Sequence, residues 1–135
     1  MTEPDEPTAA VTDSAMVVPG LEVTARQASV DTVILLVTGE IDMLTAPALD
    51  RSLAETAGGG HRRVVVDLSG VTFLSSAGIT ILVQHTANAA ARGVRLPIVA
   101  SGTAVLRPLE LTGLNTELDL HGTVDEAVDE AVDGT

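Results

Sequence analysis

The segment that most constrains the fold runs from Val64 to Gly78 and reads VVVDLSGVTFLSSAG. A buried strand is predicted over residues 63–68, where the segment begins, because the side chains there are mostly apolar. A short connector follows this strand. Two adjacent serines, Ser75 and Ser76, then open a stretch with helical periodicity. A strand that passes through a short connector into a helix is typical of domains in which helices pack against a sheet.

The remaining periodicities predict alternating strands and helices. Residues 21–25 alternate apolar and polar side chains, as a half-buried strand does, and the aliphatic run 32–38 is typical of a strand covered on both faces. In chain order the predicted elements are strands 21–25 and 32–38, a helix from an N-cap at Thr45 to Ala57, strand 63–68, helix 76–92, strand 94–100, helix 103–111, a short strand 116–120 and a last helix capped by Thr123. This order predicts an α/β fold, a mixed sheet with parallel central strands and about four helices packed against it.

The domain limits are predicted from composition. Residues 1–20 hold four acidic residues, three prolines and no basic residue, which is typical of a disordered lead. Near the other end the tetrapeptide Asp-Glu-Ala-Val occurs twice, over residues 125–132. The two ends carry nine of the nineteen acids, so solvated acidic tails explain much of the net charge of −12. One domain is therefore predicted over residues 21–132.

The composition excludes several classes of function. Phe73 is the only aromatic residue, so the core must be aliphatic, and stacking on nucleic-acid bases is not expected. The net charge of −12, without a single lysine, also disfavours contact with nucleic acid or an anionic membrane. There is no cysteine, and His61, His85 and His121 lack the spacing of a metal-ligand motif. Neither a membrane span nor a signal peptide is recognised. We expect a cytoplasmic protein that needs no metal or cofactor.

Ser75 and Ser76 allow three interpretations. As a helix cap, one hydroxyl would accept a hydrogen bond from a free N–H and contribute about 1 kcal/mol. As a phosphorylation site, a hydroxyl would gain about −1.5 to −2 charges at a helix end whose dipole tolerates them. As a catalytic nucleophile, Ser76 would need a base. His85 falls on the opposite side of the predicted helix, and only a tertiary contact could bring His61 near.

Asp42 follows the strand predicted to end near Gly39, and such an acid is typical of a turn. If that strand lies beside the strand that ends near Leu68, Asp42 and Ser76 share the sheet edge where parallel strands end and sites form. Met43 and Leu44 are expected either to form an exposed patch or to pack as a satellite of the core.

The glycines do not predict a nucleotide site. The run at residues 58–60 precedes a strand instead of following one, and a P-loop needs a lysine that this chain lacks.

Two segments resemble the signature segments of STAS domains, most closely those of bacterial anti-sigma factor antagonists. Gly39-Glu40-Ile41-Asp42 is similar to the family pattern Gly-Glu-Leu/Ile-Asp. Residues 71–79 are similar to a segment that contains Phe-Met/Ile-Asp-Ser-Ser/Thr-Gly-Leu. The predicted element order agrees with that family over about residues 20–132.

The resemblance implies a regulatory binding protein that is not an enzyme. Such proteins bind an anti-sigma factor, often a serine kinase, and so release a sigma factor. The kinase uses its own ATP to phosphorylate one serine, which breaks the complex, and a phosphatase restores it. Carried over by position, that serine is Ser76, and Asp42 is an acid close to it that helps recognition by the kinase. Ser75, Gly78 and Thr80 are expected beside them in the partner contact.

This chain departs from the family pattern next to the expected phosphorylation site. Ser75 stands where the family has aspartate, and Ala77 stands where serine or threonine is usual. The missing acid lowers the local negative charge, which could change the choice of kinase or leave Ser76 unmodified. Two alternative functions stay open, an unphosphorylated STAS scaffold or transport-associated subunit, and a small hydrolase that uses Ser76 with His61.

Overall fold

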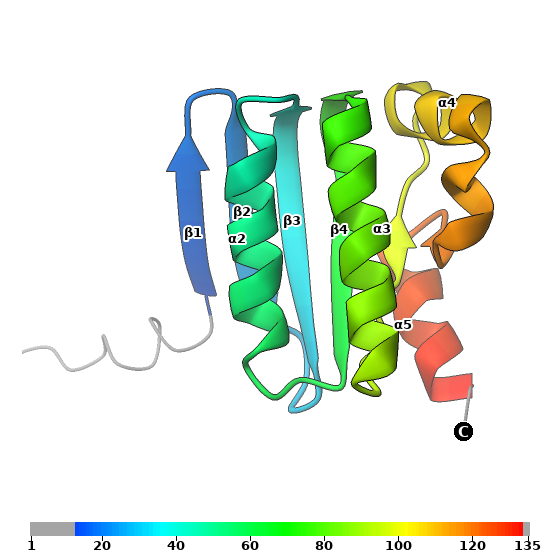
Figure 1. Cartoon of the computed structure of the whole chain (residues 1–135). Coiled ribbons are helices and arrows are strands. Elements are labelled where there is room, and N and C mark those ends of the chain that lie inside the picture. Colours follow the sequence, from blue (N-terminus) through cyan, green and yellow to red (C-terminus); the bar gives the residue numbers. More distant parts are fainter. Residues whose placement is uncertain (1–12, 134–135) are drawn as a thin grey trace, which may run out of the picture.

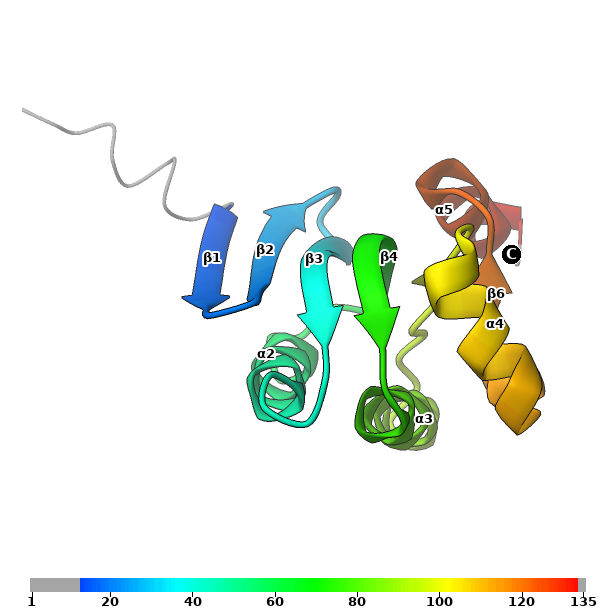
Figure 2. The ribbon, with the colours of Figure 1, turned by 90° about the horizontal axis from the view of Figure 1, so that it is seen from above.

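The computed structural model describes residues 13–133, which form a mixed six-stranded sheet with helices on both faces (Figure 1 and Figure 2). The strands are β1 Asp13–Val18, β2 Leu21–Gln27, β3 Thr32–Ile41, β4 Arg63–Leu74, β5 Ile98–Val99 and β6 Leu120–His121, and they lie in this order. β1, β2 and β3 pair antiparallel, whereas β3 to β6 pair parallel. The predicted α/β fold with parallel central strands is confirmed.

Four α-helices are described in residues 13–133. They are α2 Ala46–Ala57, α3 Ser76–Ala91, α4 Thr103–Thr112 and α5 Val124–Asp133, and a short 3-10 helix, η1 Leu114–Glu117, follows α4. α2 and α3 lie side by side on one face of the sheet, and α5 lies on the other (Figure 2). None of these helices combines the length and apolar character that a membrane span requires.

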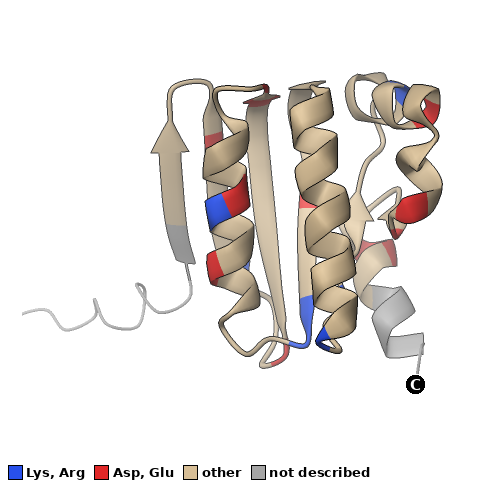
Figure 3. Cartoon of the chain, in the orientation of Figure 1, with Lys and Arg blue, Asp and Glu red and all other residues tan. Residues whose placement is uncertain are grey.

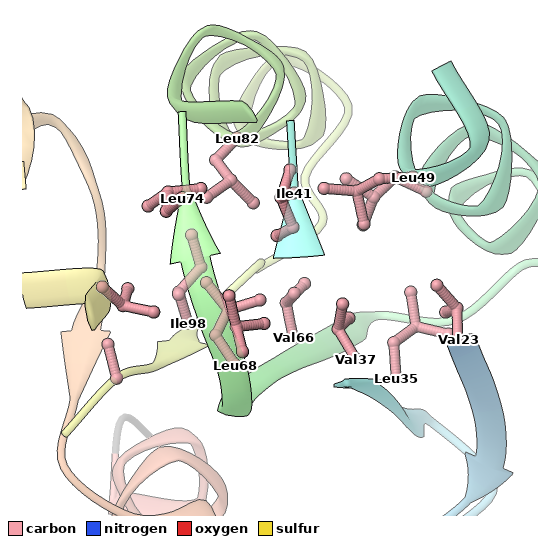
Figure 4. Close-up of a cluster of buried hydrophobic side chains, with 14 of the residues drawn as sticks. Val23, Leu35, Val37, Ile41, Leu49, Val66, Leu68, Leu74, Leu82 and Ile98 are labelled. Atoms are coloured by element: carbon pink, nitrogen blue, oxygen red, sulfur yellow. The ribbon is translucent and has the colours of Figure 1, made fainter. Parts of the chain in front are cut away.

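The main core lies between the sheet and the helices α2 and α3, and it is aliphatic as predicted (Figure 4). Burying one such side chain contributes about 1.5–3 kcal/mol, so this layer holds the two helices on the sheet. Its fully buried members include Leu35, Val37, Leu49, Val66, Leu68 and Leu82. A smaller cluster of Val65, Val99 and Ala127 fixes α5 on the opposite face.

The disordered lead predicted over residues 1–20 is corrected in its last part, because residues 13–18 form β1. This strand pairs with β2 through a turn in which Gly20 has φ +91°, a conformation that glycine adopts without strain. The acidic composition obscured the strand, although only Asp13 of the four acids falls within it. The rest of the predicted lead, residues 1–12, lies outside the described residues.

β4 extends to Leu74, well beyond the predicted end at Leu68. The extension pairs with the end of β3, and the register shifts twice along it. Gly70 permits this pairing, because a Cβ there would lie 2.6 Å from Thr38 Cγ2. The two strands therefore end together, and each is followed by a helix that starts at the same edge of the sheet.

The strands predicted over residues 94–100 and 116–120 are much shorter in the structure. β5 and β6 have two residues each, and most of the second segment belongs to η1 and the turn after it. Pro97 stands directly before β5, where it offers no N–H to a ladder. Backbone hydrogen bonds still continue the pairing on either side of the short strands, from the Val64 N–H to the Arg95 carbonyl oxygen and from the Ala100 N–H to the His121 carbonyl oxygen, both at 2.9 Å.

Candidate functional site

The ends of β3 and β4 form the edge where the predicted site residues meet. Ile41 and Leu74 are the last register partners of these parallel strands, and the Ser75 N–H donates to the Ile41 carbonyl oxygen at 2.8 Å. Asp42 and Ser75 are the next residues along the two chains. The predicted adjacency of the two strands, and with it the shared edge, is confirmed.

Ser75 and Ser76 have different roles at the start of α3. Ser75 is the N-cap residue; it is half-buried, and its Oγ accepts a long hydrogen bond from the Gly78 N–H at 3.4 Å. Ser76 is the first helical residue and is exposed. Its hydroxyl has no hydrogen-bond partner within residues 13–133. Capping therefore explains Ser75 and leaves the Ser76 hydroxyl free at the positive end of the helix dipole.

Gly78 sets how closely α3 approaches the ends of both strands. It is buried, and a Cβ at this position would lie 2.4 Å from Ile41 Cγ2 and 2.9 Å from Leu74 Cδ1. The expectation that Gly78 lies in a partner contact is therefore corrected: it faces the core and positions the turn that carries Ser76. Thr80 is exposed one turn further on, and its hydroxyl donates to the Ser76 carbonyl oxygen at 3.0 Å.

Asp42 organises the loop between β3 and α2. Its Oδ1 accepts hydrogen bonds from the N–H groups of Leu44 at 2.9 Å and Thr45 at 3.0 Å. The Thr45 hydroxyl, predicted to cap α2, instead donates to the Glu40 carbonyl oxygen at 2.7 Å and accepts from the Asp42 N–H at 2.9 Å. The bond from the Thr45 backbone N–H is the largest cause that holds the pKa of the Asp42 carboxyl below its ordinary value, against a smaller opposing effect of burial. The carboxylate is therefore charged at neutral pH.

Three large apolar side chains are exposed at the same edge, and we call them the apolar edge patch. Met43 is 75% exposed and Leu44 is 89% exposed in the loop after β3, and Phe73 is 50% exposed near the end of β4. Exposed apolar side chains gathered beside polar groups are typical of a protein–protein contact. For Met43 and Leu44 the exposed alternative is correct. Phe73 was missed, because only the extended pairing of β4 shows that it lies beside exposed Glu40.

Neither His61 nor His85 supplies a base for Ser76. His61 precedes β4 and Ser76 follows it, and the eleven residue-to-residue steps of that strand span about 36 Å at roughly 3.3 Å per step. His61 Nε2 lies 3.2 Å from Gln27 Oε1, while His85 Nε2 lies 2.6 Å from Asp50 Oδ1 and so links α3 to α2. The hydrolase interpretation therefore lacks the base that it requires. No set of three potential metal ligands gathers in residues 13–133.

Comparison with known proteins identifies relatives of this chain. The family described as STAS domain matches residues 23–127. The anti-sigma-F factor antagonist RsfB of Mycobacterium tuberculosis is 36% identical over 95 residues, which cover 70% of this chain and 77% of RsfB. An anti-sigma factor antagonist from Mycobacterium paratuberculosis has a similar solved structure, with a TM-score of 0.72 and 32% identity over 85% of this chain and 97% of that one. The anti-sigma factor antagonist SpoIIAA shares the fold, with a TM-score of 0.68 and 18% identity over 84% of this chain and 97% of its own.

Proposed function

This chain belongs to the STAS domain family, and on that basis we propose that it is an anti-sigma factor antagonist whose binding is switched by phosphorylation of Ser76. Two relatives, 36% and 32% identical, are themselves anti-sigma factor antagonists. One observation carries the proposal: the Ser76 hydroxyl is exposed and unbonded within the described residues, at the same edge as the apolar edge patch. The protein acts by binding an anti-sigma factor, which frees a sigma factor, and it catalyses no reaction itself.

The proposed partner is an anti-sigma factor of the serine-kinase type. A kinase needs an acceptor hydroxyl that can enter its active site without breaking the fold of the substrate. Ser76 meets this requirement because it is exposed and its hydroxyl supports no other group. Ser75 does not, because it is half-buried and its oxygen caps α3. The ATP belongs to the kinase, and a serine phosphatase reverses the modification.

A phosphate on Ser76 is compatible with the fold. The residue lies in the first turn of α3, where backbone N–H groups have no intrahelical acceptor and the helix dipole favours negative charge. An anionic group at such an exposed helix end contributes about 0.3–1 kcal/mol to stability. We therefore expect the phosphorylated protein to be as stable as the unmodified one.

The same charge opposes docking of a partner. When an anti-sigma factor covers this edge, the phosphate must leave water for an apolar contact, at a desolvation cost of several kcal/mol unless a cation is supplied. A cost of about 3 kcal/mol lowers the affinity roughly a hundredfold, because each 1.4 kcal/mol is a factor of ten. Charge alone is therefore sufficient for the switch, and no rearrangement of the sheet is needed.

The proposal is tested with purified kinase-type anti-sigma factors from the genome that encodes this chain, and with the anti-sigma-F factor of Mycobacterium tuberculosis as a further probe. Wild type, Ser76→Ala and the matched control Ser75→Ala are incubated with each factor and ATP, and intact mass is measured. We expect one phosphate on wild type and Ser75→Ala and none on Ser76→Ala. Affinities are then measured for Ser76→Ala and Ser76→Glu. Equal affinities for these two variants, or a phosphate that persists on Ser76→Ala, contradict the proposal.

A further inference from the structure

The loop between β3 and α2 is closed on itself by the side chain of Asp42. The Asp42 Oδ1 atom accepts hydrogen bonds from the N–H groups of both Leu44 and Thr45. The Ala46 N–H donates a further hydrogen bond to the Asp42 carbonyl oxygen at 2.8 Å. The Thr45 hydroxyl ties the same loop back to the end of β3. These bonds engage the Oδ1 atom of the Asp42 carboxylate within its own loop. They differ from the direct recognition role that the family resemblance implies for Asp42.

Met43 and Leu44 stand in the middle of this closed loop. They are 75% and 89% exposed, and neither belongs to the core clusters. A single exposed leucine on a protein surface needs no explanation. Two adjacent apolar side chains on a hydrogen-bonded loop are different, because the loop has little backbone freedom left to lose when a partner binds. The loop therefore presents Met43 and Leu44 as a preorganised apolar projection at the edge where β3 and β4 end.

The charged side chains at the end of β3 and in the loop that follows it are acidic. Glu40 is exposed beside Phe73, and Figure 3 shows acidic residues where β3 ends. Arg63 and Arg92 lie at the opposite end of the sheet, at the start of β4 and just after α3. If two copies of this chain met at this edge, the acidic side chains of one copy would face those of the other, and like-charge repulsion opposes such a dimer. An apolar pocket with basic side chains at its rim complements the projection.

We propose that Met43 and Leu44 are the apolar anchor that the anti-sigma factor receives in such a pocket, and that Asp42 is the positioning residue that holds them. This inference rests on the proposed function and extends it. Met43 and Leu44 attract the partner whether or not Ser76 is phosphorylated, and the phosphate on Ser76 adds the unfavourable term that weakens binding. Asp42 acts through the shape of the loop and does not contact the partner through its charge.

The test measures the affinity of an anti-sigma factor that binds wild type in the experiment above. The double variant Met43→Ser/Leu44→Ser is expected to bind about 30-fold more weakly or worse, the loss typical of a central apolar anchor. Asp42→Ala removes the oxygen that accepts hydrogen bonds from the Leu44 and Thr45 N–H groups, so the loop is no longer held closed. This variant is expected to bind about tenfold more weakly. Asp42→Asn keeps an acceptor oxygen and is expected to stay within about threefold of wild type. Val30→Ser is the matched control, because Val30 is 88% exposed on the turn between β2 and β3.

Amide hydrogen exchange provides a readout that does not involve the partner. Exchange at the Leu44 and Thr45 N–H groups is expected to accelerate in Asp42→Ala and to stay near the wild-type rate in Asp42→Asn. Wild-type affinity in the double serine variant overturns the anchor. An equal loss of affinity in Asp42→Asn and Asp42→Ala overturns the positioning role, because it shows that the charge itself is recognised. If wild type binds none of the anti-sigma factors, the proposed function itself fails. Unchanged amide exchange at Leu44 and Thr45 in Asp42→Ala separately overturns the claim that Asp42 holds the loop closed.

Discussion

Replacing Gly78 with alanine is expected to disturb the packing that positions Ser76. The new methyl group would lie 2.4 Å from Ile41 Cγ2 and 2.9 Å from Leu74 Cδ1. The first distance is about 1 Å shorter than the roughly 3.5–4.0 Å at which carbon atoms pack best. Alanine favours a helix over glycine by about 1 kcal/mol, but overpacking a core costs about 1–3 kcal/mol. Because Ile41 and Leu74 are buried and held by the sheet, we place the overpacking cost in the upper part of its range, about 2–3 kcal/mol, and expect a net loss of about 1–2 kcal/mol in the free energy of unfolding.

Urea unfolding followed by far-UV circular dichroism measures this loss. Gly58→Ala is the control, because Gly58 has φ −78° and a Cβ built there meets its nearest neighbours at 3.6 Å, an ordinary contact distance. In an Ile41→Ala background the closer clash is gone, so Gly78→Ala is expected to cost about 1 kcal/mol less than in wild type. The packing argument is refuted if Gly78→Ala is as stable as wild type, or if its cost is the same in both backgrounds.

Two further substitutions probe the edge that carries the site. Gly39→Ala is expected to lose more than about 2 kcal/mol of unfolding free energy, because Gly39 has φ +112° and its Cβ would lie 2.2 Å from the Gly20 carbonyl oxygen; urea unfolding with a wild-type midpoint would count against this. Asp42→Asn is expected to make stability less sensitive to acid. Because the folded pKa of Asp42 lies below its ordinary value of 3.8, the carboxylate stabilises the fold above that value, and this contribution is lost as the pH falls through the lower folded pKa. Thermal unfolding from about pH 6 to about pH 2 should show wild type losing more than the variant, and parallel curves would contradict the assignment.

The order and type of the central elements could be predicted from the sequence because they depend on local periodicity. In the aliphatic run 32–38 the alternate residues Val33, Leu35 and Val37 are buried, and Leu82 from the helical repeat after Ser76 belongs to the same core cluster. The ends of strands depend on tertiary pairing instead. β4 continues past Leu68 only because β3 lies beside it, and β1 exists only because β2 offers it a partner.

The candidate site was predictable as a set of neighbours but not as a set of roles. Parallel strands end at one edge, so the sequence alone predicts that Asp42 and the serine pair lie close together. Which serine caps α3 depends on where the helix begins, a boundary that periodicity does not resolve to one residue. The buried position of Gly78 and the closed loop of Asp42 depend on contacts with Ile41 and Thr45 that no spacing rule encodes.

The most direct measurement of the central claim compares one protein in two states. The chain is incubated with ATP and a kinase-type anti-sigma factor that binds it, the position of any phosphate is mapped by mass spectrometry, and the affinity for that factor is measured before and after modification. The phosphate is expected on Ser76 alone, with affinity lowered roughly a hundredfold or more and with unfolding unchanged. Equal affinity of the two states, with Ser76 fully phosphorylated, would contradict the claim that negative charge at the start of α3 controls binding.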